Sequence, residues 1–85
     1  MLRISVTGSD GDEVTLRLEG ELRGPWVDEV RQSCDDFLAR GGKLTLELSQ
    51  VSFVDRAAID LLKSLEARNV VLKDGSPFVN EALTR

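Results

Sequence analysis

Few side chains in this 85-residue sequence could take part in catalysis. It contains no histidine and no tyrosine, and Cys34 is its single cysteine. The sequence therefore lacks the usual general base, most zinc-binding patterns and any intramolecular disulfide. The remaining isolated carboxylates and hydroxyls do not suggest a nucleophile and a base held within reach of each other. We expect a protein that is not an enzyme and that uses no metal or other cofactor.

Charge and spacing also disfavour other kinds of site. The formal net charge of −4 would repel phosphate backbones and anionic membrane surfaces, so nucleic acid is not an expected partner. The acidic residues around Asp10 and Asp35 lack the ordered spacing of a calcium-binding loop. The glycines form no Walker or dinucleotide fingerprint, which leaves a nucleotide-sensing scaffold as a less favoured function.

The first half of the sequence predicts a hairpin followed by a helix. Apolar and polar residues alternate over residues 2–6 and 14–18, with turn-forming residues at 8–12 between them. Gly20 and Gly24-Pro25 end the second strand, and Pro25 suits the first turn of a helix. The expected apolar stripe of this helix carries Cys34 as a buried, inert thiol.

Two further features of this helix can be predicted. We expect Trp26 to pack in the core or at its rim, with an exposed binding anchor as the alternative. Gly41-Gly42 should close the helix as a left-handed cap.

The second half of the sequence predicts another strand and helix, followed by a short strand and a short helix. Residues 44–48 alternate as a strand that ends near Ser49-Gln50. Asp55 is the expected N-cap of a helix running to about residues 67–69, because its carboxylate can accept amide protons of the first turn. Residues 70–72 form a short buried strand. A last helix follows, with Ser76 as its candidate cap and with an apolar side made of Phe78, Val79, Ala82 and Leu83.

The element order strand, strand, helix, strand, helix, strand, helix indicates the α/β class. Residues 1–85 should form a single domain with about four strands in one mixed sheet, covered by helices on one face. The other face should point to solvent, with Arg3, Thr15, Arg17, Thr45 and Glu47.

Residues 48–62 resemble the central signature of STAS domains, the family of sulphate transporters and anti-sigma-factor antagonists. There a strand leads through a short apolar loop to an aspartate, here Asp55, and then to a leucine-rich helix. The glycine-marked end of the second strand at Gly20 is also similar. The resemblance implies the STAS-like (SpoIIaa-like) fold and a protein-protein interaction module that resembles an anti-sigma-factor antagonist.

The sequence departs from the family pattern in its switch segment and in its C-terminal elements. The regulatory serine or threonine of the family is Ala57 here, its neighbour is Arg56, and Ala58 replaces a glycine. We therefore expect no direct phosphorylation at the switch position. The chain also ends after its third predicted helix, where the family continues with a strand and a helix. This predicts a sheet one strand short, and a homodimer through an edge or the uncovered face.

The resemblance places a partner-binding surface at the turn before the first helix and at the start of the second. Its expected residues are Arg23, Gly24, Pro25, Asp55, Arg56, Ala57 and Asp60. The partner would be a protein such as an anti-sigma factor, and Arg56 is our candidate for contacting an acidic group on it.

The apolar segments of the sequence are all short. Without a signal peptide or an apolar run of about 18 residues, we expect a cytoplasmic protein with no direct membrane insertion. The alternative function is a STAS-like accessory subunit of a membrane complex that transports lipids or anions.

Overall fold

A computed structural model describes residues 2–75 and 77–84. Its elements, in chain order, are β1 (Leu2–Asp10), β2 (Glu13–Leu22), α1 (Pro25–Ala39), β3 (Lys43–Val54), α2 (Arg56–Ala67), β4 (Val71–Lys73) and α3 (Pro77–Leu83). This order and the mixed four-stranded sheet confirm the predicted fold class.

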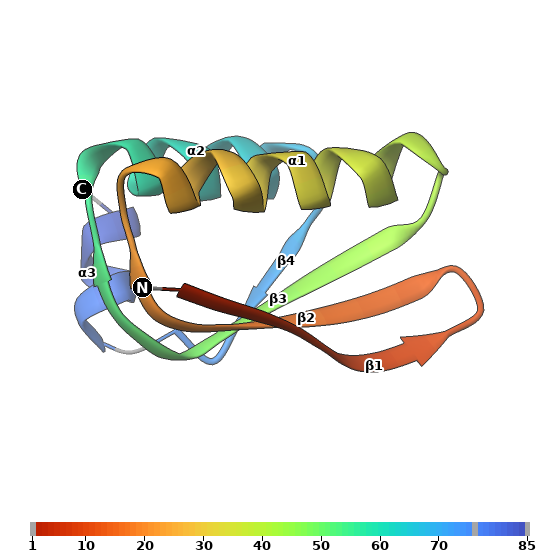
Figure 1. Cartoon of the computed structure of the whole chain (residues 1–85), viewed down its shortest axis with the longest axis horizontal. Coiled ribbons are helices and arrows are strands. Elements are labelled where there is room, and N and C mark those ends of the chain that lie inside the picture. Colours follow the sequence, from red (N-terminus) through yellow and green to blue (C-terminus); the bar gives the residue numbers. More distant parts are fainter. Residues whose placement is uncertain (1, 76, 85) are drawn as a thin grey trace.

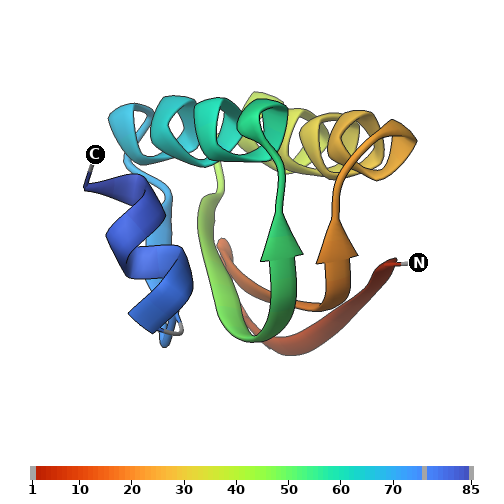
Figure 2. The same cartoon turned by 90° about the vertical axis from the view of Figure 1, so that its left-hand side faces the viewer.

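The sheet has the strand order β1-β2-β3-β4, with β1 antiparallel to β2 and with β2, β3 and β4 parallel. Helices α1 and α2 lie side by side over one face (Figures 1 and 2), and α3 contacts α2 and β3 at one end of the molecule. Because β2 and β3 are parallel, their carboxyl ends meet at the same end of the sheet. Helices α1 and α2 therefore both begin at that end.

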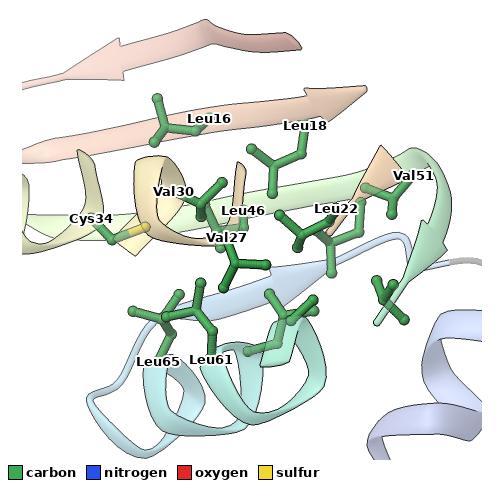
Figure 3. Close-up of a cluster of buried hydrophobic side chains, with 14 of the residues drawn as sticks. Leu16, Leu18, Leu22, Val27, Val30, Cys34, Leu46, Val51, Leu61 and Leu65 are labelled. Atoms are coloured by element: carbon green, nitrogen blue, oxygen red, sulfur yellow. The ribbon is translucent and has the colours of Figure 1, made fainter. Parts of the chain in front are cut away.

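The core lies between the sheet and the two helices, and every buried side chain among the described residues is apolar. Figure 3 shows leucines of β2 and β3 facing α1 and α2, with Cys34 of α1 among them. Burial, with a smaller contribution from Asp35, raises the pKa of the Cys34 thiol to about 11. This placement confirms that Cys34 is buried, and its inertness stays a prediction. Trp26 is half-buried and packs against the core, as predicted for its rim.

Both long strands extend further than the alternation predicted. Gly20 does not end β2, and β3 does not stop at Ser49-Gln50 but runs to Val54. The pairing of β2 with β3 shifts register twice, between Arg17 and Glu19 and between Gly20 and Glu21. Such irregularities change which face a residue occupies while the ladder continues. The alternation of apolar and polar residues is therefore interrupted although the strand continues. Beyond the interruption in β3, Val51 and Val54 are buried.

The other element boundaries differ by smaller amounts. β1 extends to Asp10, so the hairpin turn is shorter than residues 8–12. Gly41, at φ +78°, closes α1 as predicted, and the Gly41 and Gly42 N–H groups donate to Leu38 and Phe37.

The last strand and helix were predicted in part. β4 begins at Val71 and is not a buried strand, because it lies at an edge and Val71 faces the outer side, opposite Thr45. Val79 of α3 is fully buried. The predicted cap Ser76 and the Phe78 side chain lie outside the described residues.

The face of the sheet away from α1 and α2 is polar, as predicted. Arg17 and Glu47 are register partners on it and form an ion pair of 3.4 Å. Arg3 is exposed there, and Thr15 and Thr45 are half-buried. None of the helices in the described part of the chain is long and apolar enough to cross a membrane.

We expect Leu46→Ala to lower the free energy of unfolding by about 2 to 5 kcal/mol, because it opens a cavity between β3 and the helices. Leu46 is fully buried, whereas Val71 on the neighbouring strand is 56% exposed. Val71→Ala is the matched control and should cost no more than about 1 kcal/mol. Urea denaturation followed by circular dichroism measures both; equal losses would contradict the placement of the core.

Candidate functional site

The predicted site lies where β2 and β3 end side by side. Leu22 and Val54 are the last register partners of the two strands, and the Asp55 N–H donates to the Leu22 carbonyl at 3.2 Å. The β2–α1 turn therefore starts next to the residue that precedes α2. Gly24 in this turn has φ +57° and ψ −134°, a conformation that favours glycine.

The carboxylate of Asp55 joins the two segments. Its Oδ1 accepts a hydrogen bond from the Ala58 N–H at 2.8 Å, which makes Asp55 the N-cap of α2, as predicted. Its Oδ2 accepts from the Gly24 N–H at 3.0 Å, 31 residues away in the sequence. Gly24 is the N-cap of α1 and has no side chain to provide such a bond. One carboxylate thus satisfies backbone donors at the starts of two helices.

This geometry also sets the charge of Asp55. The N–H groups of Gly24 and Ala58 favour the ionised carboxylate and lower the pKa of Asp55 from its ordinary value of 3.8. The positive ends of the α1 and α2 dipoles act in the same direction. Asp55 is therefore an anion at neutral pH with both oxygens occupied.

The first turn of α2 presents the side chains of Arg56 and Ala57 to solvent. Arg56 is 88% exposed and its Nε lies 3.5 Å from Asp60 Oδ1. This contact partly compensates a cation placed at the positive end of a helix. Exposed pairs of this kind are weak, which leaves Arg56 able to change partners. Ala57 is exposed without a hydroxyl, and Ala58 is buried beneath it.

An exposed aromatic side chain, Phe53, extends this surface. Phe53 is 39% exposed, and the Arg23 guanidinium carbon lies 5.9 Å from its ring centroid, within cation–π range. Arg23 also lies 3.4 Å from Glu21, the register partner of Phe53. Arg23 was predicted to belong to this surface, whereas Phe53 was not. The short apolar segment before Asp55 gives no local signal that Phe53 is exposed, because its exposure follows from the register shifts between β2 and β3.

Among the predicted residues, Asp55 contacts Gly24 and Arg56 contacts Asp60. Arg23 contacts Phe53, which was not predicted. Pro25, also predicted, is exposed at the first position of α1. Their role in binding a partner stays a prediction. In the part of the chain described here, no three His, Cys, Asp or Glu side chains form a group that could hold a metal ion. The arrangement suits recognition of another surface.

We expect Asp55→Ala to lower the free energy of unfolding by about 1 to 2 kcal/mol, because it removes the N-cap of α2 and the bond to Gly24. Asp36→Ala is the control, since Asp36 is exposed in the last turn of α1, far from the helix start. Urea denaturation of both variants measures the effect. A cost for Asp55→Ala no larger than for Asp36→Ala would contradict the structural role of the carboxylate.

The free energy of unfolding should depend on pH in a way that reflects the lowered pKa of Asp55. Its pKa is lower in the folded chain than the ordinary 3.8 of an unfolded one. Its contribution is therefore complete above the unfolded pKa and is lost as the pH falls through the folded pKa. The free energy of unfolding measured from about pH 6 to about pH 2 should drop less steeply for Asp55→Asn than for the unchanged chain. Parallel curves would show that Asp55 has no lowered pKa.

Comparisons with known proteins bear on the fold and on the family of this chain. No curated protein matches the sequence. Among solved structures, an anti-sigma factor antagonist, SpoIIAA in its unphosphorylated form, is similar with a TM-score of 0.75 and 21% identity, over 96% of this chain and 82% of that one. A structure described as Mglu is similar with a TM-score of 0.62 and 23% identity, over 88% of this chain but only 19% of that one.

These structural likenesses concern the fold. The family model described as "Mlab, STAS domain" matches residues 5–85, nearly the whole chain. The chain belongs to this STAS domain family.

Proposed function

We propose that this chain is a non-enzymatic protein-interaction module that binds a regulatory protein through the surface formed by Arg23, Phe53, Arg56 and Ala57. We call these four residues the α2-start surface. The observation that carries the proposal is the double hydrogen bond of Asp55, which fixes the β2–α1 turn against the start of α2. Two segments far apart in the sequence thereby form one continuous, preorganised patch, which reduces the ordering cost of binding.

The composition of the α2-start surface supports a protein partner with an acidic group. It combines a half-exposed aromatic ring with two arginines, residue types that are enriched in binding hot spots. Among the described residues, the ion pairs of both arginines are exposed, and a partner carboxylate can replace them. The partner class we propose is an anti-sigma factor, by likeness to the solved anti-sigma factor antagonist.

Control of binding would come from the partner rather than from phosphorylation of the α2 start. Residues 53–63 contain no serine, threonine or tyrosine. A modification that adds negative charge at this helix start therefore has no acceptor there. Arg56 places a permanent positive charge beside the position that carries the hydroxyl in the family pattern.

The chemistry of Asp55 supports the absence of catalysis. A general base is most effective when its pKa lies near the working pH. Asp55 has a lowered pKa, and both of its oxygens already accept backbone N–H groups. It therefore serves as a structural anion.

The test is binding measured with purified components. A tagged chain captures a partner, and titration calorimetry then measures the affinity of that partner for four variants. Arg56→Glu and Arg23→Glu should each weaken binding at least about tenfold, because they oppose an acidic partner with a negative charge. Arg40→Glu is the matched control: Arg40 is an exposed arginine at the opposite end of α1, and its variant should bind normally.

The fourth variant is Phe53→Ala, and the nature of the captured partner distinguishes the proposed function from its alternatives. Phe53→Ala should also weaken binding if the ring contributes contact area. Unchanged affinity of all three surface variants would move the interface elsewhere. A permease or ATPase as the captured protein would favour the accessory-subunit function over anti-sigma regulation. A thermal midpoint raised by GTP would instead favour nucleotide sensing.

A further inference from the structure

Strand β1 forms one edge of the sheet and contributes no residue to the α2-start surface. It pairs with β2 on one side, and its other side has no partner strand among the described residues. At nine residues it is three times as long as β4, the strand at the other edge. Figure 2 shows β1 at the margin of the sheet, on the side away from α3. A long open edge is a template for pairing with another chain.

The exposed side of β1 is apolar in its centre. Val6 is 60% exposed, more than any other large apolar side chain in the described structure. Its register partner is Leu16, which is buried in the core. Val6 therefore points to the same side of the sheet as the core, but beyond the area that the helices cover. Pairing of β1 with a further strand would bring apolar atoms next to it.

A register shift in β1 between Val6 and Gly8 decides which residues share a face. Before the shift, Ile4 and Val6 lie opposite core residues of β2, and after it Ser9 does. The residues on the outer, polar face are Arg3, Ser5, Gly8 and Asp10. Thr7 is the extra residue at the irregularity. A self-pairing register must match these faces, because a slip by one residue exposes the apolar side.

We propose that β1 pairs with β1 of a second copy of this chain, antiparallel, about a two-fold axis between Val6 and Thr7. In this register Arg3 lies opposite Asp10 of the partner, Ser5 opposite Gly8, and Ile4 opposite Ser9. Each of these pairs joins residues of the same face. If the pairing of the two strands shifted by one residue in either direction, a residue of the outer face would lie opposite a residue of the core-facing side.

The charges of β1 fit this arrangement. Neither Arg3 nor Asp10 has an ion-pair partner among the residues that the structure describes. Asp10 lies opposite Glu13 within the hairpin, a like-charge pair that is unfavourable in an antiparallel ladder. Arg3 of the second copy would lie on the open side of Asp10 and offset this repulsion. The two-fold axis produces the favourable Arg3–Asp10 pair twice.

The interface would be small and partly ionic, so the dimer should depend on concentration and weaken with salt. Sedimentation velocity of the whole chain at low salt should show monomer in dilute solution and dimer as the concentration rises to about 1 mM. A strictly monomeric chain over this range would overturn the proposal.

Charge exchange tests the register itself. Arg3→Glu and Asp10→Arg should each abolish the dimer when studied alone, because they place like charges opposite each other. An equal mixture of the two variants should dimerise again, since Glu at position 3 then faces Arg at position 10, and Asp10 faces Arg3. Circular dichroism confirms that each variant is folded. A mixture that stays monomeric would refute this register.

The apolar contact has its own matched pair of variants. Val6→Lys places a charge in the centre of the proposed interface, and Val71→Lys places one at a similarly exposed position, 56% against 60%, on the other edge strand. Only Val6→Lys should remove the dimer. If Val71→Lys removes it and Val6→Lys does not, the copies pair through β4 and the proposal is wrong.

Discussion

The hydrogen bonds of one carboxylate, Asp55, organise the functional end of this domain. Parallel pairing of β2 and β3 brings the starts of α1 and α2 together, but it also brings together two helix ends with unsatisfied N–H groups and dipoles of the same sign. The carboxylate of Asp55 accepts hydrogen bonds from the Gly24 and Ala58 N–H groups, and its negative charge stabilises the positive ends of both helix dipoles. The α2-start surface exists as a single patch because this bridge holds its two segments in place.

Sequence periodicity was sufficient to predict the order of the elements and the single mixed sheet. It succeeded because each helix and strand buries one face, and the positions of Leu16, Leu18, Leu44 and Leu46 follow directly from that requirement. It failed where pairing is irregular. Gly20 looked like a strand end but lies within β2 at φ +107°, and Ser49-Gln50 interrupts the alternation of β3 without ending it. A single sequence does not show that a neighbouring strand continues the ladder past such a point.

The candidate site, like the fold, could be predicted from the sequence only in part. An aspartate before an apolar helical stretch indicates an N-cap, and the missing hydroxyl at Ala57 is evident from the residue itself. The bond from Gly24 was not predictable, because its donor is a backbone amide 31 residues away and has no side-chain signature. Phe53 was missed for a related reason. Its exposure depends on the register of β2 against β3, and hence on tertiary structure rather than on local pattern.

The parallel ladder between β2 and β3 also has a consequence for how the chain folds. It joins residues about thirty positions apart, whereas the β1–β2 hairpin closes through a short turn. Closing the longer loop costs more chain entropy, and α1 lies within that loop. The hairpin can form early, but β2 keeps an open edge until α1 has crossed the sheet. Synthesis must therefore reach β3 before the nascent chain can complete its central pairing and shield its leucines from other chains.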